Sequence, residues 1–137
     1  KHTIEFEPPQ PVLLIQADPV QLDHALTNYI SNAIKYTPEN GKIAIQIQII
    51  DDRLYVEVSD NGLGIPEKAR DQLFQTFYRA RQPGTENIPG TGLGLSLVKS
   101  VIRQHNGAVY YRPEKQGSTF GFWLPASIMI TPSPDSP

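Results

Sequence analysis

Two consecutive segments near the middle of the chain alternate between apolar and polar residues. Isoleucine stands at every second position over residues 43–49, and after Asp51-Asp52 the alternation continues with Leu54, Val56 and Val58. In a β-strand, alternate side chains point to opposite faces of the sheet. The pattern therefore predicts two strands joined by a turn, with one apolar face that other elements must cover.

Helical periodicity predicts the elements that cover this face. Apolar residues recur every three or four positions from Asp18-Pro19, which predicts a capped helix start, to Pro38, which ends the run. A short helix is predicted over residues 66–77 and a longer one over residues 93–105, ended by Asn106-Gly107. Further strands are predicted over residues 3–7, 12–16, 109–111 and 119–124, the last two as a hairpin. The expected fold class is α+β: a two-layer α/β sandwich with three main helices packed on one face of a mixed, mostly antiparallel sheet.

Length and composition limit the possible classes of protein. The chain has 137 residues, a formal charge of −2 and no cysteine. The length suits one domain, expected over residues 1–126, whereas residues 127–137, which end in a Pro/Ser-rich run, are expected to be a disordered tail or linker. The lack of cysteine excludes disulfides, thiolate zinc sites and a cysteine nucleophile. The balanced charge gives no reason to expect binding to nucleic acid or a membrane surface, and no apolar run is long enough to span a bilayer.

Three polar residues on the first predicted helix form the first candidate site. Asn28, Asn32 and Lys35 fall within about 60° of one another on the helical wheel. Asparagine is a poor helix former, so two of them in the middle of a helix go against propensity without a capping role. Two amide oxygens and an ammonium group suit a magnesium ion with its phosphates, and the alternative is an ordinary solvated face.

The second candidate site is the segment Asp60-Asn61-Gly62-Leu63-Gly64, which follows the second alternating strand. Asp60 shares its strand face with Val56 and Val58, so its carboxylate should point toward the core, where it needs hydrogen-bond donors. The exocyclic amine of a purine would be such a donor, and two glycines would let the backbone approach a flat ring. The alternative is a simple turn, for which Asp-Asn-Gly is typical.

The third candidate site is Gly90-Thr91-Gly92-Leu93-Gly94-Leu95, at the start of the last predicted helix. Backbone amides at a glycine-rich helix start can bind phosphate, although the segment matches neither the dinucleotide-binding nor the P-loop pattern. A flexible loop is the alternative. Residues 79–89, which are polar and turn-rich, are predicted to form a mobile lid before it.

The three histidines lack the sequence neighbours of a metal site or a catalytic pair. His2 is terminal, and His24 lies beside the apolar stripe of the first predicted helix. His105 falls near a helix C-terminus, where a partial positive charge is favourable. A structural role is therefore expected for all three.

Taken together, and in this order, the candidate segments resemble the catalytic ATP-binding domain of bacterial sensor histidine kinases, in the GHKL ATPase/kinase superfamily. Residues 28–38 are similar to its N box, Asp60-x-Gly62-x-Gly64 to its first glycine box, residues 74–79 to its F box, residues 90–95 to its second glycine box and residues 117–120 to its small terminal one. The resemblance covers roughly residues 1–126, and five ordered motifs are far more specific than any one glycine loop.

The resemblance implies a role for each matching residue. Asn32 would hold Mg²⁺, Asn28 and Lys35 would contact the phosphates of ATP, and Asp60 would accept a hydrogen bond from the adenine amine. Tyr36 would pack near the nucleotide. Arg79, at the start of the lid, would stabilise the γ-phosphate, so the expected catalytic residues are Asn28, Lys35 and Arg79. The other expected nucleotide-binding positions are Gly62, Gly64, Ile65, Thr91, Gly92, Leu93, Gly94, Leu95 and Thr119.

One departure from the wider superfamily indicates the type of reaction. Hydrolytic members carry a glutamate base where this chain has Asn28, and an amide cannot take a proton from water. The resemblance therefore implies phosphoryl transfer by positioning and charge neutralisation. In this family the phosphoacceptor histidine precedes an acidic residue in an upstream helical hairpin, and none of the three histidines here has that context.

The resemblance implies that the chain is the catalytic domain of a sensor histidine kinase and lies in the cytoplasmic portion of that kinase. It would bind Mg-ATP or ADP and donate the γ-phosphate of ATP to a histidine on a separate dimerisation and histidine-phosphotransfer domain of the same kinase. Without that domain it would not autophosphorylate. A response regulator receiver domain would be an indirect partner, and neither nucleic acid nor a membrane would be contacted directly. The alternative is a non-catalytic module in which the nucleotide only gates an interaction.

Overall fold

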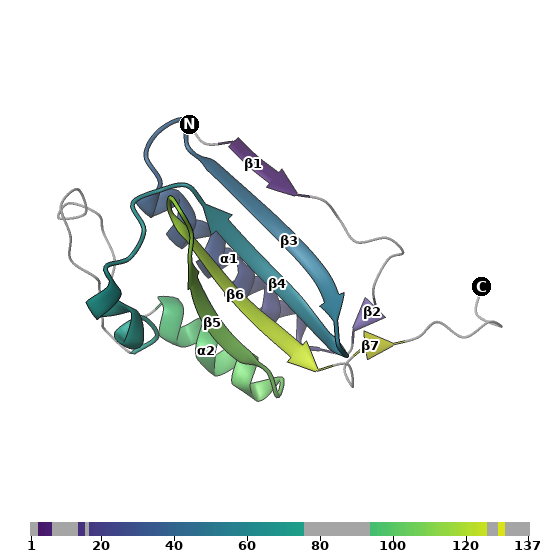
Figure 1. Cartoon of the computed structure of the whole chain (residues 1–137). Coiled ribbons are helices and arrows are strands. Elements are labelled where there is room, and N and C mark those ends of the chain that lie inside the picture. Colours follow the sequence, from purple (N-terminus) through teal and green to yellow (C-terminus); the bar gives the residue numbers. More distant parts are fainter. Residues whose placement is uncertain (1–2, 7–13, 16, 76–93, 126–128, 131–137) are drawn as a thin grey trace.

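A mixed five-stranded sheet, with helices over one of its faces, makes up most of the described part of the chain (Figure 1). The computed structural model describes residues 3–6, 14–15, 17–75, 94–125 and 129–130. Its elements are β1 (Thr3–Phe6), β2 (Leu14–Ile15), α1 (Pro19–Tyr36), β3 (Lys42–Ile50), β4 (Arg53–Asp60), the 3-10 helix η1 (Glu67–Gln72), α2 (Gly94–Gln104), β5 (Ala108–Pro113), β6 (Ser118–Pro125) and β7 (Met129–Ile130). The main sheet has the order β1-β3-β4-β6-β5, and only the β1–β3 pair is parallel. The α+β fold with a mixed, mostly antiparallel sheet is thereby confirmed.

The two alternating segments form the central hairpin of this sheet. β3 pairs with β4 from Ile43↔Asp60 to Ile50↔Arg53, so the turn consists of Asp51 and Asp52 alone. Both turn residues have positive φ, 48° and 65°, which is the backbone that two-residue hairpins need to match the strand twist. The predicted strand pair is therefore confirmed, including its apolar face.

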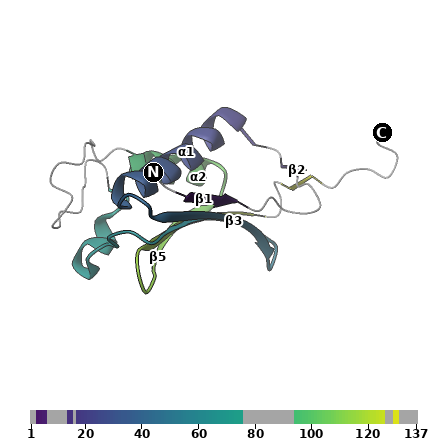
Figure 2. The same ribbon diagram turned by 90° about the horizontal axis from the view of Figure 1, so that it is seen from above.

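Both α-helices lie on that apolar face, and Figure 2 shows the sheet edge-on with α1 and α2 on the same side. α1 begins as predicted, because Asp18 Oδ1 accepts hydrogen bonds from the backbone amides of Val20 and Gln21. After α2, Asn106 has a left-handed φ of 65° and the Gly107 amide donates to the Ile102 carbonyl, which closes the helix end. The buried apolar residues of the two layers are Ala25, Tyr29, Ala33, Val98, Val101 and Ile102 on the helices and Ile43, Ile45, Leu54, Val56, Val58, Phe120, Phe122 and Leu124 on the strands.

Tyr29 fastens α1 to the middle of the sheet. Its ring is fully buried and lies 5.8 and 6.0 Å, centroid to centroid, from the rings of Phe120 and Phe122. Its hydroxyl donates to the Gly121 carbonyl at 2.8 Å, so the one polar atom of this core side chain is satisfied. Burial also raises the pKa of the Tyr29 phenol well above its ordinary value. The residue therefore fixes which turn of α1 lies over β6.

The structure differs from the expected elements at two places. Within the short helix predicted over residues 66–77, Glu67–Gln72 form a 3-10 helix at the end of the sheet where β4 ends (Figures 1 and 2), because the amides of Ala69 and Leu73 bond to carbonyls three residues back. Within the tail expected over residues 127–137, the apolar pair Met129–Ile130 forms β7, which pairs with β2. These two residues therefore belong to a strand, which differs from the expected disorder.

The face of the sheet opposite α1 and α2 carries polar and aromatic side chains. Arg53 lies over the ring of Trp123, with its guanidinium carbon 3.8 Å from the ring centroid, and Tyr55 meets Tyr110 edge-on. We call this side the outer face. Neither described α-helix offers a stretch of the length and hydropathy that a membrane crossing needs.

Candidate functional site

Asp60 is a buried carboxylate at the end of the central strand β4. It is 8% exposed and lies on the same face as the apolar residues of β4, as its position in the alternation predicts. Its Oδ1 accepts a hydrogen bond from the Gly62 amide at 2.9 Å. Burial raises the pKa of Asp60, and the backbone hydrogen bonds of Gly62 and Ser118 only partly oppose that effect. The result is a strong acceptor in surroundings with little water.

Two glycines let the backbone close around Asp60. A side chain on Gly117 would collide with the Asp60 carbonyl oxygen, and its φ of 93° suits glycine alone. A side chain on Gly62 would collide with the Tyr36 carbonyl oxygen at the end of α1. The Leu63 amide donates to that same carbonyl at 3.3 Å. The segment after β4 is therefore held between the end of α1 and the start of β6.

The polar face of α1 leads from this segment to the start of α2. The Asn28 amide nitrogen donates to the His24 carbonyl at 2.8 Å. A Cβ at Gly94 would stand 3.2 Å from the Asn28 Oδ1 atom, so the first residue of α2 lies against Asn28. Asn28 and Tyr36 are eight residues apart on α1, which is about 12 Å of helix. The helix therefore spans the distance between the second and third candidate segments.

The structure brings together some of the predicted site residues. Asn28 and Gly94 are in contact, as are Tyr36 and Gly62, while Gly64 packs beside the Gly117 carbonyl. On α1, Asn32 is half-buried and Lys35 is exposed. Ile65 and Leu95 are partly buried and pack on the core. Four predicted site residues lie outside the described part of the chain: Arg79, Thr91, Gly92 and Leu93. The expected lid, residues 79–89, lies outside it as well.

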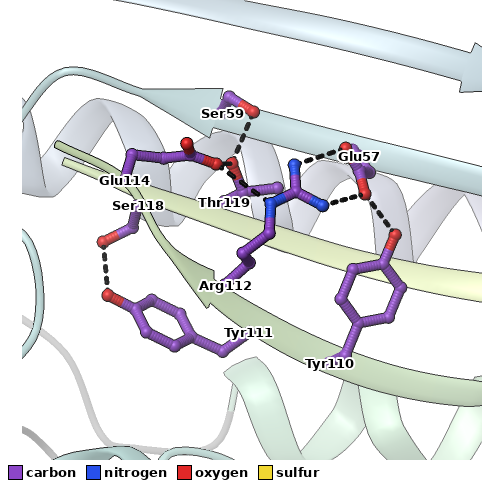
Figure 3. Close-up of polar contacts among 8 residues, drawn as sticks. All are labelled: Glu57, Ser59, Tyr110, Tyr111, Arg112, Glu114, Ser118 and Thr119. Carbon is purple, nitrogen blue, oxygen red and sulfur yellow. Dashed lines mark hydrogen bonds and ion pairs between the residues drawn. The ribbon is translucent and has the colours of Figure 1, made fainter. Parts of the chain in front are cut away.

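Thr119 is not brought to Asp60, because it lies on the outer face of β6. Its hydroxyl is bonded to Ser59 and Glu114 there (Figure 3). The neighbouring Ser118 stands on the Asp60 face instead, directly opposite Asp60 in the β4–β6 register, and is 3% exposed. Its Oγ lies 3.2 Å from the Tyr111 hydroxyl. Sequence reasoning missed Ser118, although the alternation with Phe120 and Phe122 is a signal that could have found it.

His105 has a structural role, but not as a positive charge at the helix end. Its Nε2 accepts a hydrogen bond from the Asp18 amide at 3.1 Å, which requires an unprotonated nitrogen. Its Nδ1 then carries the proton and donates to the Val101 carbonyl at 2.9 Å. The ring joins the end of α2 to the start of α1. The expectation of a favourable positive charge is wrong here, because the partner of Nε2 is a donor 87 residues away in sequence.

The described residues suit a magnesium ion that is coordinated mainly by phosphate and water oxygens. Among them no three His, Cys, Asp or Glu side chains are grouped as metal ligands. Mg²⁺ in nucleotide sites commonly takes one or two protein oxygens, with the remaining positions filled by phosphate and water. The polar face of α1 offers the amide oxygens of Asn28 and Asn32, which suits that arrangement. It does not suit a metal held by protein side chains alone.

Comparison with known proteins places this geometry in a family. Residues 17–128 match the family described as histidine kinase-, DNA gyrase B- and HSP90-like ATPase. The circadian input-output histidine kinase CikA of Synechococcus elongatus is 38% identical over 120 residues, which cover 87% of this chain and 16% of CikA. The sensor histidine kinase WalK of Bacillus subtilis is 37% identical over 116 residues, which cover 82% of this chain and 19% of WalK. The chain thus spans less than a fifth of these relatives.

Solved structures of histidine kinases have the same fold. The nucleotide-free catalytic domain of histidine kinase ThkA has a TM-score of 0.79 and 31% identity, over 91% of this chain and 80% of that one. Full-length ShkA, crystallised in complex with AMPPNP, has a TM-score of 0.77 and 32% identity, over 90% of this chain and 25% of ShkA. The sheet and helices described above are therefore the GHKL α/β fold of histidine kinase catalytic domains. The chain belongs to the family of histidine kinase-, DNA gyrase B- and HSP90-like ATPases.

Proposed function

We propose that this chain is the catalytic domain of a sensor histidine kinase: it binds Mg-ATP and donates the γ-phosphate to a histidine on a separate dimerisation and phosphoacceptor domain of the same kinase. The observation that carries the proposal is the buried Asp60 carboxylate, framed by Gly62 and Gly117 beside the polar face of α1. The names of the relatives support it, since CikA and WalK are histidine kinases. The AMPPNP complex of ShkA supports a nucleotide as the ligand.

Asp60 would select adenine through hydrogen-bond chemistry. A carboxylate offers only acceptors, so it pairs with the exocyclic amine of adenine and repels the carbonyl that inosine or guanine carries at the same position. The Gly62 and Ser118 amides already bond to the carboxylate and hold it in place. Discrimination against the carbonyl bases is expected because an unpaired buried acceptor is costly.

The polar face of α1 would hold the phosphates and the metal. Asn32 would bind Mg²⁺, and Asn28 and Lys35 would contact phosphate oxygens, with Thr91, Gly92, Leu93 and Arg79 contributing from the segment before α2. A magnesium ion held there would neutralise part of the negative charge on the phosphates. Asn28 cannot act as a base for water, because its amide nitrogen is a donor, here to the His24 carbonyl. Transfer would depend on positioning an external nucleophile in line with the γ-phosphorus.

The external nucleophile would be a neutral imidazole nitrogen of the phosphoacceptor domain. It would form the new N–P bond while the bond from the γ-phosphorus to the bridging oxygen breaks, and ADP would leave with that electron pair. A response regulator receiver domain would be reached only through that histidine. ThkA has been crystallised with its response regulator TrrA, which supports two-component signalling as the setting. The domain would act in the cytoplasm, where ATP is supplied.

Calorimetry with ADP and inosine diphosphate tests the nucleotide part of this proposal. The chain should bind ADP more tightly, and Asp60→Asn should lose most of that affinity, about 10- to 100-fold for a hydrogen bond to a charged group. Asp71→Asn, which neutralises an exposed carboxylate on η1, is the matched control and should bind like the parent. Equal binding of ADP by parent and Asp60→Asn would contradict the proposed site.

Phosphotransfer to a supplied partner tests the kinase part. With Mg-ATP labelled on the γ-phosphate and the phosphoacceptor domain of its parent kinase, the chain should place acid-labile label on that domain. The Asp60→Asn chain should do so more slowly at ATP concentrations that do not saturate it. Tight ADP binding without any transfer would support the alternative of a nucleotide-gated module.

A further inference from the structure

Ser118 and Thr119 are adjacent on β6, and their side chains lie on opposite faces of the sheet. Ser118 faces Asp60, and its backbone amide bonds to the Asp60 carboxylate. Thr119 is paired with Ser59, the residue before Asp60, and is fully buried although it lies on the outer face. One dipeptide therefore connects the Asp60 site to the side of the sheet that carries no described helix.

The Thr119 hydroxyl joins the strands to the β5–β6 turn. Its oxygen lies 2.5 Å from Glu114 Oε2, and because a carboxylate accepts, Thr119 is the donor. The Ser59 hydroxyl, 2.7 Å away, must then donate its proton to Thr119. The three side chains form one directed chain of hydrogen bonds, Ser59 to Thr119 to Glu114, which we call the outer triad (Figure 3).

Arg112, on β5, links Glu114 of the outer triad to Glu57 on β4. Its Nε donates to Glu114 Oε2 at 3.2 Å, and its two terminal nitrogens bond to the two oxygens of Glu57 at 2.9 and 3.0 Å. Tyr110 donates to Glu57 as well. Burial would raise the pKa of Glu57, but the hydrogen bonds and charge of Arg112 and the hydrogen bond of Tyr110 overcome this and lower it. Glu114 is therefore held from two sides, by Thr119 and by Arg112.

The turn that Glu114 occupies also carries Gly117. Gly117 lies so close to the Asp60 carbonyl that it has no room for a Cβ, and Ser118 follows it directly. A displacement of the turn would move Gly117 and the Ser118 amide away from Asp60, since β6 begins at Ser118. The outer triad is the described set of side-chain bonds that ties this turn to β4 next to Asp60.

We propose that Thr119 and Glu114 are positioning residues for Asp60: from the outer face they hold the β5–β6 turn so that the Ser118 amide and Gly117 fix the carboxylate in its base-selecting orientation. This inference rests on the proposed function, because it assigns the outer triad to the adenine selectivity of that site. Thr119 itself touches no nucleotide in this arrangement. Its hydroxyl acts through Glu114 and the turn.

The test compares four variants for binding of ADP and inosine diphosphate by calorimetry, at a temperature where circular dichroism shows each to be folded. Thr119→Val removes the hydroxyl at nearly constant shape, and Glu114→Gln weakens its acceptor. Both should lose about 3- to 10-fold in ADP affinity, with little change for inosine diphosphate, so that the ratio of the two affinities falls. Thr119→Ser keeps the hydroxyl and should keep the ratio.

Tyr110→Phe is the matched control, because it removes an outer-face hydrogen bond to Glu57 without touching the outer triad. It should leave the affinity ratio unchanged. An unchanged ratio in Thr119→Val, or an equal fall in Tyr110→Phe, overturns the inference while leaving the proposed function intact. Failure of the parent chain to prefer ADP overturns both.

Discussion

Gly94, the first residue of α2, lies against Asn28 in the middle of α1, while His105 after the end of α2 is bonded to Asp18 at the start of α1. The two contacts are ten residues apart along α1 and eleven along the α2 side, about 15 and 16.5 Å at the rise of an α-helix. The helices are therefore antiparallel and fixed against each other at both ends of the overlap. The contact at Asn28 is within the proposed phosphate site, and the contact at His105 is far from it.

Gly94→Ala should weaken nucleotide binding without much loss of stability. The new Cβ would stand 3.2 Å from Asn28 Oδ1 and displace that side chain, whereas alanine favours the helix by up to about 1 kcal/mol. Chemical denaturation should show a small change in unfolding free energy, and calorimetry a lower affinity for ADP. The control is the double variant with Asn28→Ala. Because Asn28→Ala removes the crowded atom, Gly94→Ala should cost less affinity in that background, and strictly additive losses would contradict the contact.

Replacement of Asp60 should change how stability depends on pH. Its folded-state pKa is raised above the ordinary 3.8, so between that value and the raised one the folded chain binds more protons than the unfolded chain. The contribution of Asp60 to stability is therefore complete below about pH 3.8 and falls as the pH rises through the raised pKa. Denaturation of the nucleotide-free chain from about pH 3.5 to 7 should show Asp60→Asn gaining stability relative to the parent as the pH rises. A relative loss with rising pH would contradict the sign.

His105→Ala should destabilise the chain by about 1 kcal/mol, since it removes two hydrogen bonds that water can partly replace. His24→Ala is the matched control on the exposed side of α1 and should stay within about 0.5 kcal/mol of the parent. Both can be measured by urea denaturation at neutral pH. Equal stability of the two variants would mean that the link between α2 and Asp18 contributes nothing.

The chain alone should neither label itself nor turn over ATP appreciably. His105 has its Nε2 lone pair engaged by the Asp18 amide, and the resemblance implies that Asn28 takes the place of the glutamate base of hydrolytic superfamily members. After incubation with γ-labelled Mg-ATP, the chain should carry no covalently attached label, even where it binds the nucleotide. Label on His24 or His105, or phosphate release that survives Asn28→Ala, would contradict the assignment of roles.

The fold and the position of Asp60 could be predicted because both follow from local patterns. The alternation that ends in Val58 and Asp60 fixes which face each side chain occupies, and Asp18-Pro19 marks a helix start through its own backbone bonds. The partner of His105 could not be predicted, since it is brought close only by helix packing. Thr119 was expected near the nucleotide because its motif matched, whereas the strand period alone assigns that place to Ser118. The roles of Arg79 and of the glycines before Gly94 remain predictions.

The pairing of Arg53 with Trp123 has a practical consequence for following this domain in solution. Trp123 is the only tryptophan in the chain, and it lies on the outer face, opposite Tyr55 in the β4–β6 register. Asp60 lies five positions further along β4 than Tyr55, about 17 Å of strand, and the sheet itself lies between the indole and the helix side. The fluorescence of Trp123 should therefore report whether the sheet is folded. It should not change when a ligand binds on the helix side of the sheet.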